Sequence, residues 1–194
     1  MHVKSAQTRQ PIHELMRDRW SSRAFSSEPI SESEIIAVLE AGRWAPSSYN
    51  EQPWRFLVGL RPDELWHKIF DALDAFNQAW CSRAPALIVL CAKKHFSHNG
   101  VENFHAVYDC GQAAMSMALQ AQALGLITHQ MAGFSWRKIK ESFDLSDEFH
   151  PTAVIALGGR GSDDYLSEDL RANETKPRSR RSLAELVLAS KLSL

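Results

Sequence analysis

The chain is organised around W-A-P-S-S-Y-N-E-Q-P-W-R-F, residues 44–56. A helical hydrophobic pattern ends just before this stretch, and an apolar run begins at its end. Its two prolines each remove a backbone donor and stiffen the path of the chain. The other polar side chains both donate and accept hydrogen bonds: Ser47, Ser48, Asn50 and Gln52. Composition alone favours an ordinary polar turn, but such a loop also suits a flat heteroaromatic ligand edged with N–H and C=O groups.

Length, composition and charge predict one globular domain, residues 10–194, after a flexible tail of residues 1–9. A chain of 194 residues can bury roughly 70% of its unfolded surface. A hydrophobic content of 44% is that of an ordinary globular protein. The formal charge of −1 gives no excess of positive charge for binding nucleic acid or an anionic membrane. No apolar run approaches the ~18 residues that cross a membrane. The three cysteines lack C-x-x-C spacing and indicate a reduced, cytoplasmic setting.

Hydrophobic spacing predicts helices and strands in irregular order, which favours an α+β fold over a regular βαβ array. The sequence S-E-S-E at 31–34 is a capping box at the start of one helix. Many alanines and serines in the longest helix predict close packing against another helix. The expected helices cover residues 11–18, 32–43, 62–77, 104–124 and 135–143, and the expected strands cover 56–60, 86–92, 126–131 and 153–157.

Two arginines flank a serine in the sequence R-W-S-S-R, residues 19–23. Guanidinium groups and a hydroxyl all donate hydrogen bonds to phosphate oxygens, so this segment is a candidate anion site. Such charges are more often a solvated helix end, and the residues alone leave both interpretations open. A second basic cluster lies in the expected tail, residues 172–194, at Lys176, Arg178, Arg180 and Arg181.

Three other kinds of site are weaker candidates. The glycines of residues 158–161 lack the third glycine of G-x-G-x-x-G, because Asp164 occupies it, so a dinucleotide loop is rejected. His95, His98 and His105 show no recognisable metal-ligand spacing, and an exposed polar loop explains them better than a metal site. No G-x-S-x-G motif accompanies Ser47 or Ser48 of the central loop, residues 46–52, so a hydrolase is disfavoured.

The sequence R-W-A-P-S-S-Y-N-E-Q-P-W at 43–54 resembles the R-W-A-P-S-x-x-N-x-Q-P-W signature of the FMN-dependent nitroreductase family. The pattern R-x-S-x-R before Phe25 is similar to the segment that binds the FMN phosphate in that family. The resemblance covers about residues 10–188. It implies the nitroreductase-like fold, a central mixed β-sheet flanked by helices, in an intertwined homodimer whose interface includes the long helix.

The resemblance also implies an FMN site at the subunit interface. Arg19 and Ser21, with Arg178 or Arg180, would bind the phosphate, and Arg23 would lie near the ribityl chain or the pyrimidine edge. Trp20 stands where many members have an arginine or histidine, and Trp80 stands where many have a lysine. The effect of these two tryptophans on the charge around the flavin stays open. The other subunit would contribute its central loop. The remaining residues implied are Pro46, Ser47, Ser48, Asn50, Gln52, Asn77, Gln130, Met131, Ala132 and Gly133.

The resemblance implies an oxidoreductase in which NADH or NADPH is a transient donor. Hydride would pass through flavin N5 to a quinone, nitroaromatic or similar acceptor by a ping-pong mechanism, with no catalytic side chain and no metal. Two alternatives stay open: a flavin enzyme of different chemistry, such as a dehalogenase or flavin-fragmenting enzyme, and a non-enzymatic flavin carrier or sensor. The physiological acceptor and the preferred nucleotide do not follow from the sequence.

Overall fold

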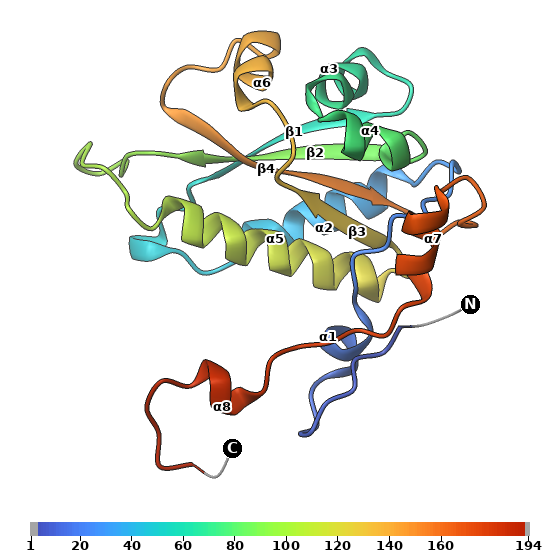
Figure 1. Cartoon of the computed structure of the whole chain (residues 1–194). Helices are drawn as coiled ribbons and strands as arrows, with labels where there is room; N and C mark the ends of the chain where they lie inside the picture. Colours follow the sequence, from blue (N-terminus) through green and yellow to red (C-terminus); the bar gives the residue numbers. More distant parts are fainter. Residues whose placement is uncertain (1–3, 193–194) are drawn as a thin grey trace.

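A four-stranded sheet forms the centre of the structure, a computed structural model that describes residues 4–192 (Figure 1). The strand order is β1-β2-β4-β3, and each neighbouring pair is antiparallel. The α+β fold is therefore confirmed, whereas the pairing within the described chain is purely antiparallel rather than mixed. The strands are β1 (Trp54–Leu60), β2 (Ala86–Lys93), β3 (Ile127–Met131) and β4 (Phe149–Gly158).

Strand β2 is buried on both faces, as its unbroken apolar sequence predicted. Successive side chains of a strand point to opposite faces of the sheet. Leu87 and Val89 accordingly belong to one hydrophobic cluster, and Ile88 and Leu90 belong to the other. The two clusters are the two halves of the core, and β2 separates them.

Helices cover both faces of the sheet (Figure 1). On one face, α5 packs closely against another helix, α2, as the sequence predicted, and the small residue at the contact is Gly42 of α2: a Cβ atom there would lie 2.8 Å from Cγ of Met117 on α5. Within residues 4–192, no helix is long and apolar enough to cross a membrane. The helices on this face are α2 (Glu32–Arg43) and α5 (Ala106–Ala123), and those on the other are α3 (Glu64–Ala72), α4 (Ala75–Cys81) and α6 (Trp136–Ser142).

Several element boundaries differ from expectation. The single helix expected after Pro62 is two helices, because Asp74 caps a new helix by accepting a hydrogen bond from the backbone N–H of Asn77 at 2.8 Å. The first helix, α1 (Glu14–Asp18), begins three residues late, where His13 caps it. The sequence missed α7 (Glu168–Thr175), which has too few apolar residues to show a helical period, and the expected tail contains α8 (Leu183–Leu186).

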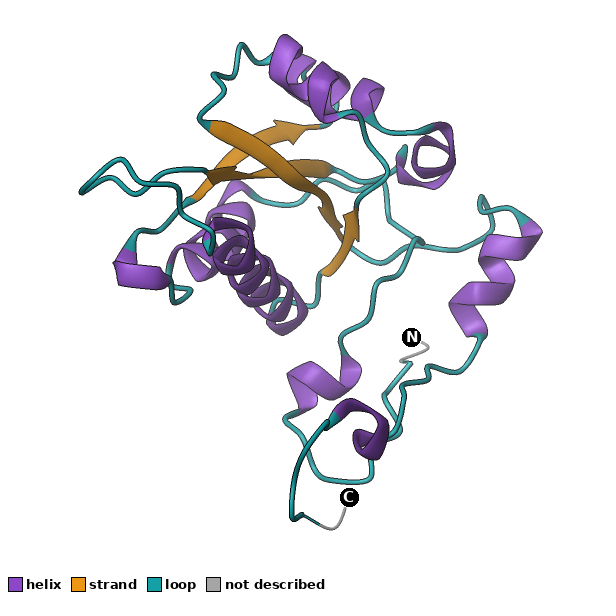
Figure 2. Cartoon of the chain, turned by 60° about the vertical axis from the view of Figure 1, so that its left-hand side comes forward, coloured by secondary structure: helices purple, strands orange, loops and turns teal. Residues whose placement is uncertain are grey.

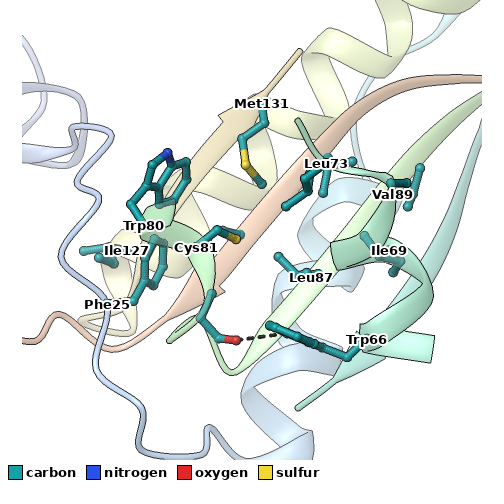
Figure 3. Packing of buried hydrophobic residues seen from close by; sticks show 14 of the residues in the cluster. Phe25, Trp66, Ile69, Leu73, Trp80, Cys81, Leu87, Val89, Ile127 and Met131 are labelled. Atoms are coloured by element: carbon teal, nitrogen blue, oxygen red, sulfur yellow. Dashed lines mark hydrogen bonds between the residues drawn. The ribbon is translucent and has the colours of Figure 1, made fainter. Parts of the chain in front are cut away.

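The face under α3, α4 and α6 is rich in aromatic side chains (Figure 3). The rings of Phe25 and Trp80 are stacked with centroids 6.1 Å apart, and both side chains are fully buried. The indole N–H of Trp66 donates to the carbonyl oxygen of Ala84 at 3.0 Å. The stacking on Trp80 attaches residues 24–25, from the N-terminal part of the chain, to this half of the core.

The three cysteines are free and buried. Burial raises the pKa of the Cys81 and Cys91 thiols to about 12, and burial together with neighbouring acidic groups does the same for Cys110. The thiolate is the reactive form of cysteine, so these side chains act as small apolar groups in the core.

His129 on β3 makes stability depend on pH. Burial, reinforced by the charge of Arg23, lowers its pKa from 6.5 to about 4. As the pH falls from 6.5 towards 4, the unfolded chain therefore binds a proton that the folded chain does not. The free energy of unfolding should fall by about 3 kcal/mol across that range and be unaffected by this group above pH 7.

Urea unfolding of the wild type and of His129→Gln at several pH values measures this effect. The difference between their unfolding free energies should change steadily from pH 7 to pH 4, because only the wild type carries the buried imidazole. The exposed His98→Gln controls for the loss of a histidine. A difference that stays constant over this range would contradict the assignment.

Candidate functional site

Residues 19–25 run past β3 and α7, and the backbone of their second half is held by hydrogen bonds from several elements. The N–H of Arg23 donates to Oε1 of Glu174 at 3.0 Å, and the N–H of Phe25 donates to the hydroxyl of Tyr165 at 2.9 Å. The Nδ1–H of His129 donates to the carbonyl oxygen of Ser22 at 3.2 Å. The backbone N–H groups of Arg23 and Phe25 are thus already used within the fold, and the side chains of this segment stay available to an anion beside it.

Three guanidinium groups gather at the start of this segment, where Nη1 of Arg178 donates to the carbonyl oxygen of Arg17 at 2.6 Å. Burial lowers the pKa of Arg19, and the nearby charges of Arg178 and Arg180 lower it further. The pKa of Arg178 is likewise lowered by burial and by Arg180, with Asp18 acting in the opposite direction. The fold thus places two arginines of the C-terminal segment beside an arginine of the N-terminal segment. Both tail arginines named from the sequence lie in this cluster, and positive charges held together in this way favour an anion.

The guanidinium of Arg23 lies between two aromatic rings. It is 5.6 Å from the ring centroid of Phe76 and 5.7 Å from that of Trp80. Its Nε atom is buried and has no hydrogen-bond partner among the described residues. A buried donor without a partner costs about 1–3 kcal/mol, so this position suits a ligand that supplies an acceptor.

Asn77 and Gly133 form a second part of the same site. The Nδ2–H of Asn77 donates to the carbonyl oxygen of Gly133 at 3.0 Å, and Trp80 Nε1–H donates to Asn77 Oδ1 at 3.2 Å. A Cβ atom at Gly133 would lie 2.0 Å from Oδ2 of Asp74, so a larger residue here would displace the side chain that caps α4. In the preceding stretch, Gln130 and Ala132 are exposed and Met131 is buried in the core.

Trp20 lies between two cations at the edge of the arginine cluster. The ammonium of Lys4 is 4.5 Å from its ring centroid, and the guanidinium of Arg160 is 4.9 Å from it. Cation–π attraction explains the position of the indole, which adds no charge of its own to the cluster. Lys4 belongs to the expected N-terminal tail. Of that tail, residues 1–3 lie outside the described residues.

The central loop, residues 46–52, has an unusual backbone. Tyr49, Asn50 and Gln52 have φ angles of +52°, +55° and +51°, a region that residues other than glycine rarely adopt. Such strain persists only where the surroundings hold it, and it is frequent at functional sites. The loop contains the short helix η1 (Ser48–Asn50), and its Pro46 is exposed.

Side chains from two other segments hold this loop. The N–H of Ser48 donates to Oδ2 of Asp109 on α5 at 3.0 Å. The hydroxyl of Ser47 accepts from the N–H of Gln52 at 3.0 Å. The Glu51 carboxylate lies 3.1 Å from Nζ of Lys93 and accepts from the N–H of Ser97 at 2.9 Å. These contacts fix the backbone and side chains of the loop at several points.

One chain does not bring all the expected site residues together. The central loop lies at the first turn of α5, whereas residues 19–23, the start of β3 and α7 lie towards the other end of that helix (Figure 1). The residues named from the sequence therefore form two groups. The first contains Arg19, Trp20, Ser21, Arg23, Asn77, residues 130–133, Arg178 and Arg180, and the second contains Pro46, Ser47, Ser48, Asn50 and Gln52.

The glycines after β4 have a packing role. A Cβ atom at Gly161 would lie 2.6 Å from the carbonyl oxygen of Phe25, so the glycine lets the N-terminal segment pass close to the sheet. Of the histidines considered for a metal site, His95 pairs with a carboxylate, since its Nδ1 is 2.7 Å from Oε2 of Glu148. Among the described residues, no group of three or more ligating side chains could hold a metal ion.

Sequence reasoning missed three side chains that hold the first group in place: Glu174, Tyr165 and His129. Each is a lone residue in a segment without a motif, and its partner lies more than a hundred residues away in the chain. Local patterns contain no signal for such pairs, so only the fold reveals them.

Comparison with known proteins identifies the family of this chain. The model of the nitroreductase family matches residues 16–79 and 59–159. An Archaeoglobus fulgidus protein named "Putative NADH dehydrogenase/NAD(P)H nitroreductase" is 29% identical over 82% of this chain and 91% of its own.

Solved structures give the same result. An oxidoreductase containing FMN superposes with a TM-score of 0.91 at 32% identity, over 100% of this chain and 98% of its own. A Desulfovibrio desulfuricans protein solved in complex with FMN superposes with a TM-score of 0.76 at 26% identity, over 96% and 100%. The family resemblance expected from residues 43–54 is confirmed, and the chain belongs to the nitroreductase family.

Proposed function

We propose that this protein is an FMN-dependent NAD(P)H oxidoreductase that acts as a homodimer. The acceptor would be a quinone, a nitroaromatic or a similar small molecule. Family membership, the NAD(P)H in the name of the Archaeoglobus relative and the FMN of the two solved structures support this proposal. The buried, free thiols also suit a reducing compartment such as the cytoplasm.

The clustered guanidiniums of Arg19, Arg178 and Arg180 carry the proposal. Three like charges repel one another, and a phosphate would convert that repulsion into charge-assisted hydrogen bonds. The hydroxyl of Ser21, which is exposed beside them, can donate as well. Because both Arg178 and Arg180 lie near Arg19, we assign both to the phosphate.

Arg23 suits the pyrimidine edge of a flavin ring. Its unpartnered Nε can donate to a ring oxygen or nitrogen, and its positive charge favours the anionic reduced flavin. FMN, when bound, would supply an N5 atom that takes hydride from NAD(P)H and passes two electrons to the acceptor. The chain then only has to orient the ring, exclude water and stabilise charge, so no catalytic side chain is assigned.

Two observations support the homodimer. The two groups of site residues lie apart in one chain, so a second copy would be needed to complete each site. The start of α5, beside the central loop, also exposes large apolar side chains: Phe104 is 82% exposed and Tyr108 69%. Exposed apolar patches of this kind mark interfaces. In the proposed dimer, the central loop of each subunit would line the flavin of the other.

The C-terminal segment suits an intertwined arrangement. Residues around α8 extend away from the sheet and its helix layers (Figures 1 and 2). The segment exposes Leu183, Leu186 and Leu188, the last of them 99% exposed. A second copy of the chain would give these side chains an apolar surface to cover.

Other flavin chemistry is the second candidate. A dehalogenase or flavin-fragmenting enzyme differs from a reductase mainly in its lid segments. Here the connection from β2 to α5 is short and is closed by a bridge between His95 and Glu102, which favours the reductase. A non-enzymatic flavin carrier or sensor would share the fold without the turnover.

An anaerobic titration tests the activity. The purified protein should show flavin absorption bands that bleach on addition of NADPH or NADH and return on addition of a quinone. The nucleotide that bleaches them at lower concentration is the preferred donor. Bands that never bleach would favour the carrier or another flavin chemistry, and no bands after added FMN would remove the flavin assignment.

Arg19→Ala tests the phosphate assignment. Loss of one charge-assisted hydrogen bond, about 1.5–3 kcal/mol, should raise the Kd for FMN roughly 10- to 100-fold. Riboflavin lacks the phosphate, so its Kd should hardly change. Fluorescence titration of the apoprotein measures both constants, with Arg137→Ala on α6 as a control at an exposed arginine. Undiminished FMN affinity in Arg19→Ala would refute the assignment.

Tyr108→Glu tests the shared site. A carboxylate in an apolar interface is costly to desolvate, so this variant should be a monomer in sedimentation analysis and should lose FMN. Trp136→Glu changes an exposed aromatic residue on the other face of the sheet, and it should stay dimeric and yellow. A monomeric Tyr108→Glu that binds FMN as tightly as the wild type would show that one subunit suffices.

A further inference from the structure

Glu174 is a buried carboxylate in the last turn of α7. Its side chain is only 3% exposed. One oxygen accepts from the hydroxyl of Ser22 at 2.6 Å, and the other accepts from the backbone N–H of Arg23 at 3.0 Å. Removing a carboxylate from water is unfavourable, so a residue of this kind needs an explanation that an exposed one does not.

The position of Glu174 in the chain supplies that explanation. Its two partners follow Arg19 by three and four residues, and α7 leads directly into the segment that carries Arg178 and Arg180. The carboxylate therefore joins the two segments whose guanidiniums gather at the anion site. Nη1 of Arg178 donates to the carbonyl oxygen of Arg17 at 2.6 Å, so the two segments meet two residues before Arg19. Because like charges at this contact repel one another, a second attachment through Glu174 helps to keep the segments together before an anion arrives.

Other bonds around Glu174 tighten the attachment. The hydroxyl of Ser22 also accepts from the backbone N–H of Ala24 at 3.1 Å, so the carboxylate, the hydroxyl and the backbone form one chain of hydrogen bonds. The ammonium of Lys4 donates to the carbonyl oxygen of Asn173, the residue before Glu174, at 2.7 Å. The end of α7 is thus fixed to the N-terminal segment from two sides.

We propose that Glu174 is a positioning residue for phosphate recognition. It binds no part of the ligand itself; it holds the segment bearing Arg19 against the segment bearing Arg178 and Arg180. This inference rests on the proposed FMN site and adds that the affinity for its phosphate depends on a preformed arginine cluster. Without the carboxylate, ligand binding would first have to bring the two segments together, and affinity would fall accordingly.

Glu174→Gln tests the proposal. The amide keeps the size of the side chain, but its NH2 group faces a donor at one of the two positions. In fluorescence titrations of the dimeric apoprotein, the Kd for FMN should rise about 10-fold, as expected for the loss of one hydrogen bond to a charged group. The Kd for riboflavin should rise by a clearly smaller factor, because riboflavin does not use the arginine cluster and depends on this attachment only through Arg23. A general loss of stability would weaken the binding of both flavins alike.

Two further variants complete the test. Glu168→Gln, at the exposed start of the same helix, should leave both constants unchanged. Ser22→Ala removes one of the two hydrogen bonds to Glu174 and should raise the Kd for FMN by a smaller factor than Glu174→Gln does. The double variant should bind FMN no more weakly than Glu174→Gln alone, because both changes break the same connection. If Glu174→Gln does not fold, Ser22→Ala decides the question by the same comparison of FMN with riboflavin.

Each outcome has one meaning. A selective loss of FMN affinity supports the positioning role. Equal losses for FMN and riboflavin, or an unchanged Kd for FMN, overturn it while leaving the FMN site in place. A wild-type protein that binds neither flavin overturns the proposed function together with this inference.

Discussion

The burial of β2 on both faces is the constraint from which the rest of the architecture follows. A strand with apolar side chains on both sides needs a cover on each. The structure meets this need with α2 and α5 on one face and α3, α4 and α6 on the other. Helix α5 passes under the sheet from the central loop to the start of β3, so it separates the two groups of site residues. The division of the site is thus a consequence of how the core is covered.

The fold also holds three positively charged side chains close together. The cluster of Arg19, Arg178 and Arg180 is unfavourable by itself, and the chain tolerates it by anchoring each segment to neutral or negative groups. Arg178 donates to the carbonyl oxygens of Lys4 and Arg17, and the backbone N–H of Arg23 donates to Glu174. The binding of an anion would therefore release electrostatic strain rather than require new order, which is how a preorganised site achieves affinity.

The sequence predicted much of this from local patterns. The capping box at Ser31 placed the start of α2, the unbroken apolar run placed β2, and the signature at residues 43–54 indicated the family. The sequence did not predict the break between α3 and α4, because hydrophobic spacing continues across the cap at Asp74. The sequence also did not predict the roles of Glu174, Tyr165 and His129, because each side chain bonds to a residue that only the tertiary fold brings near. Long-range polar pairs have no period for a sequence pattern to reveal.

The separation of the two residue groups within one chain has a genetic consequence. In the proposed dimer, each site would take its arginine cluster from one subunit and its central loop from the other. Suppose that one allele encodes a chain with a damaged arginine cluster and another encodes a chain with a damaged loop. A mixed dimer of the two would then contain one site with both defects and one site with none. Two alleles that are inactive alone would partly complement each other when expressed together.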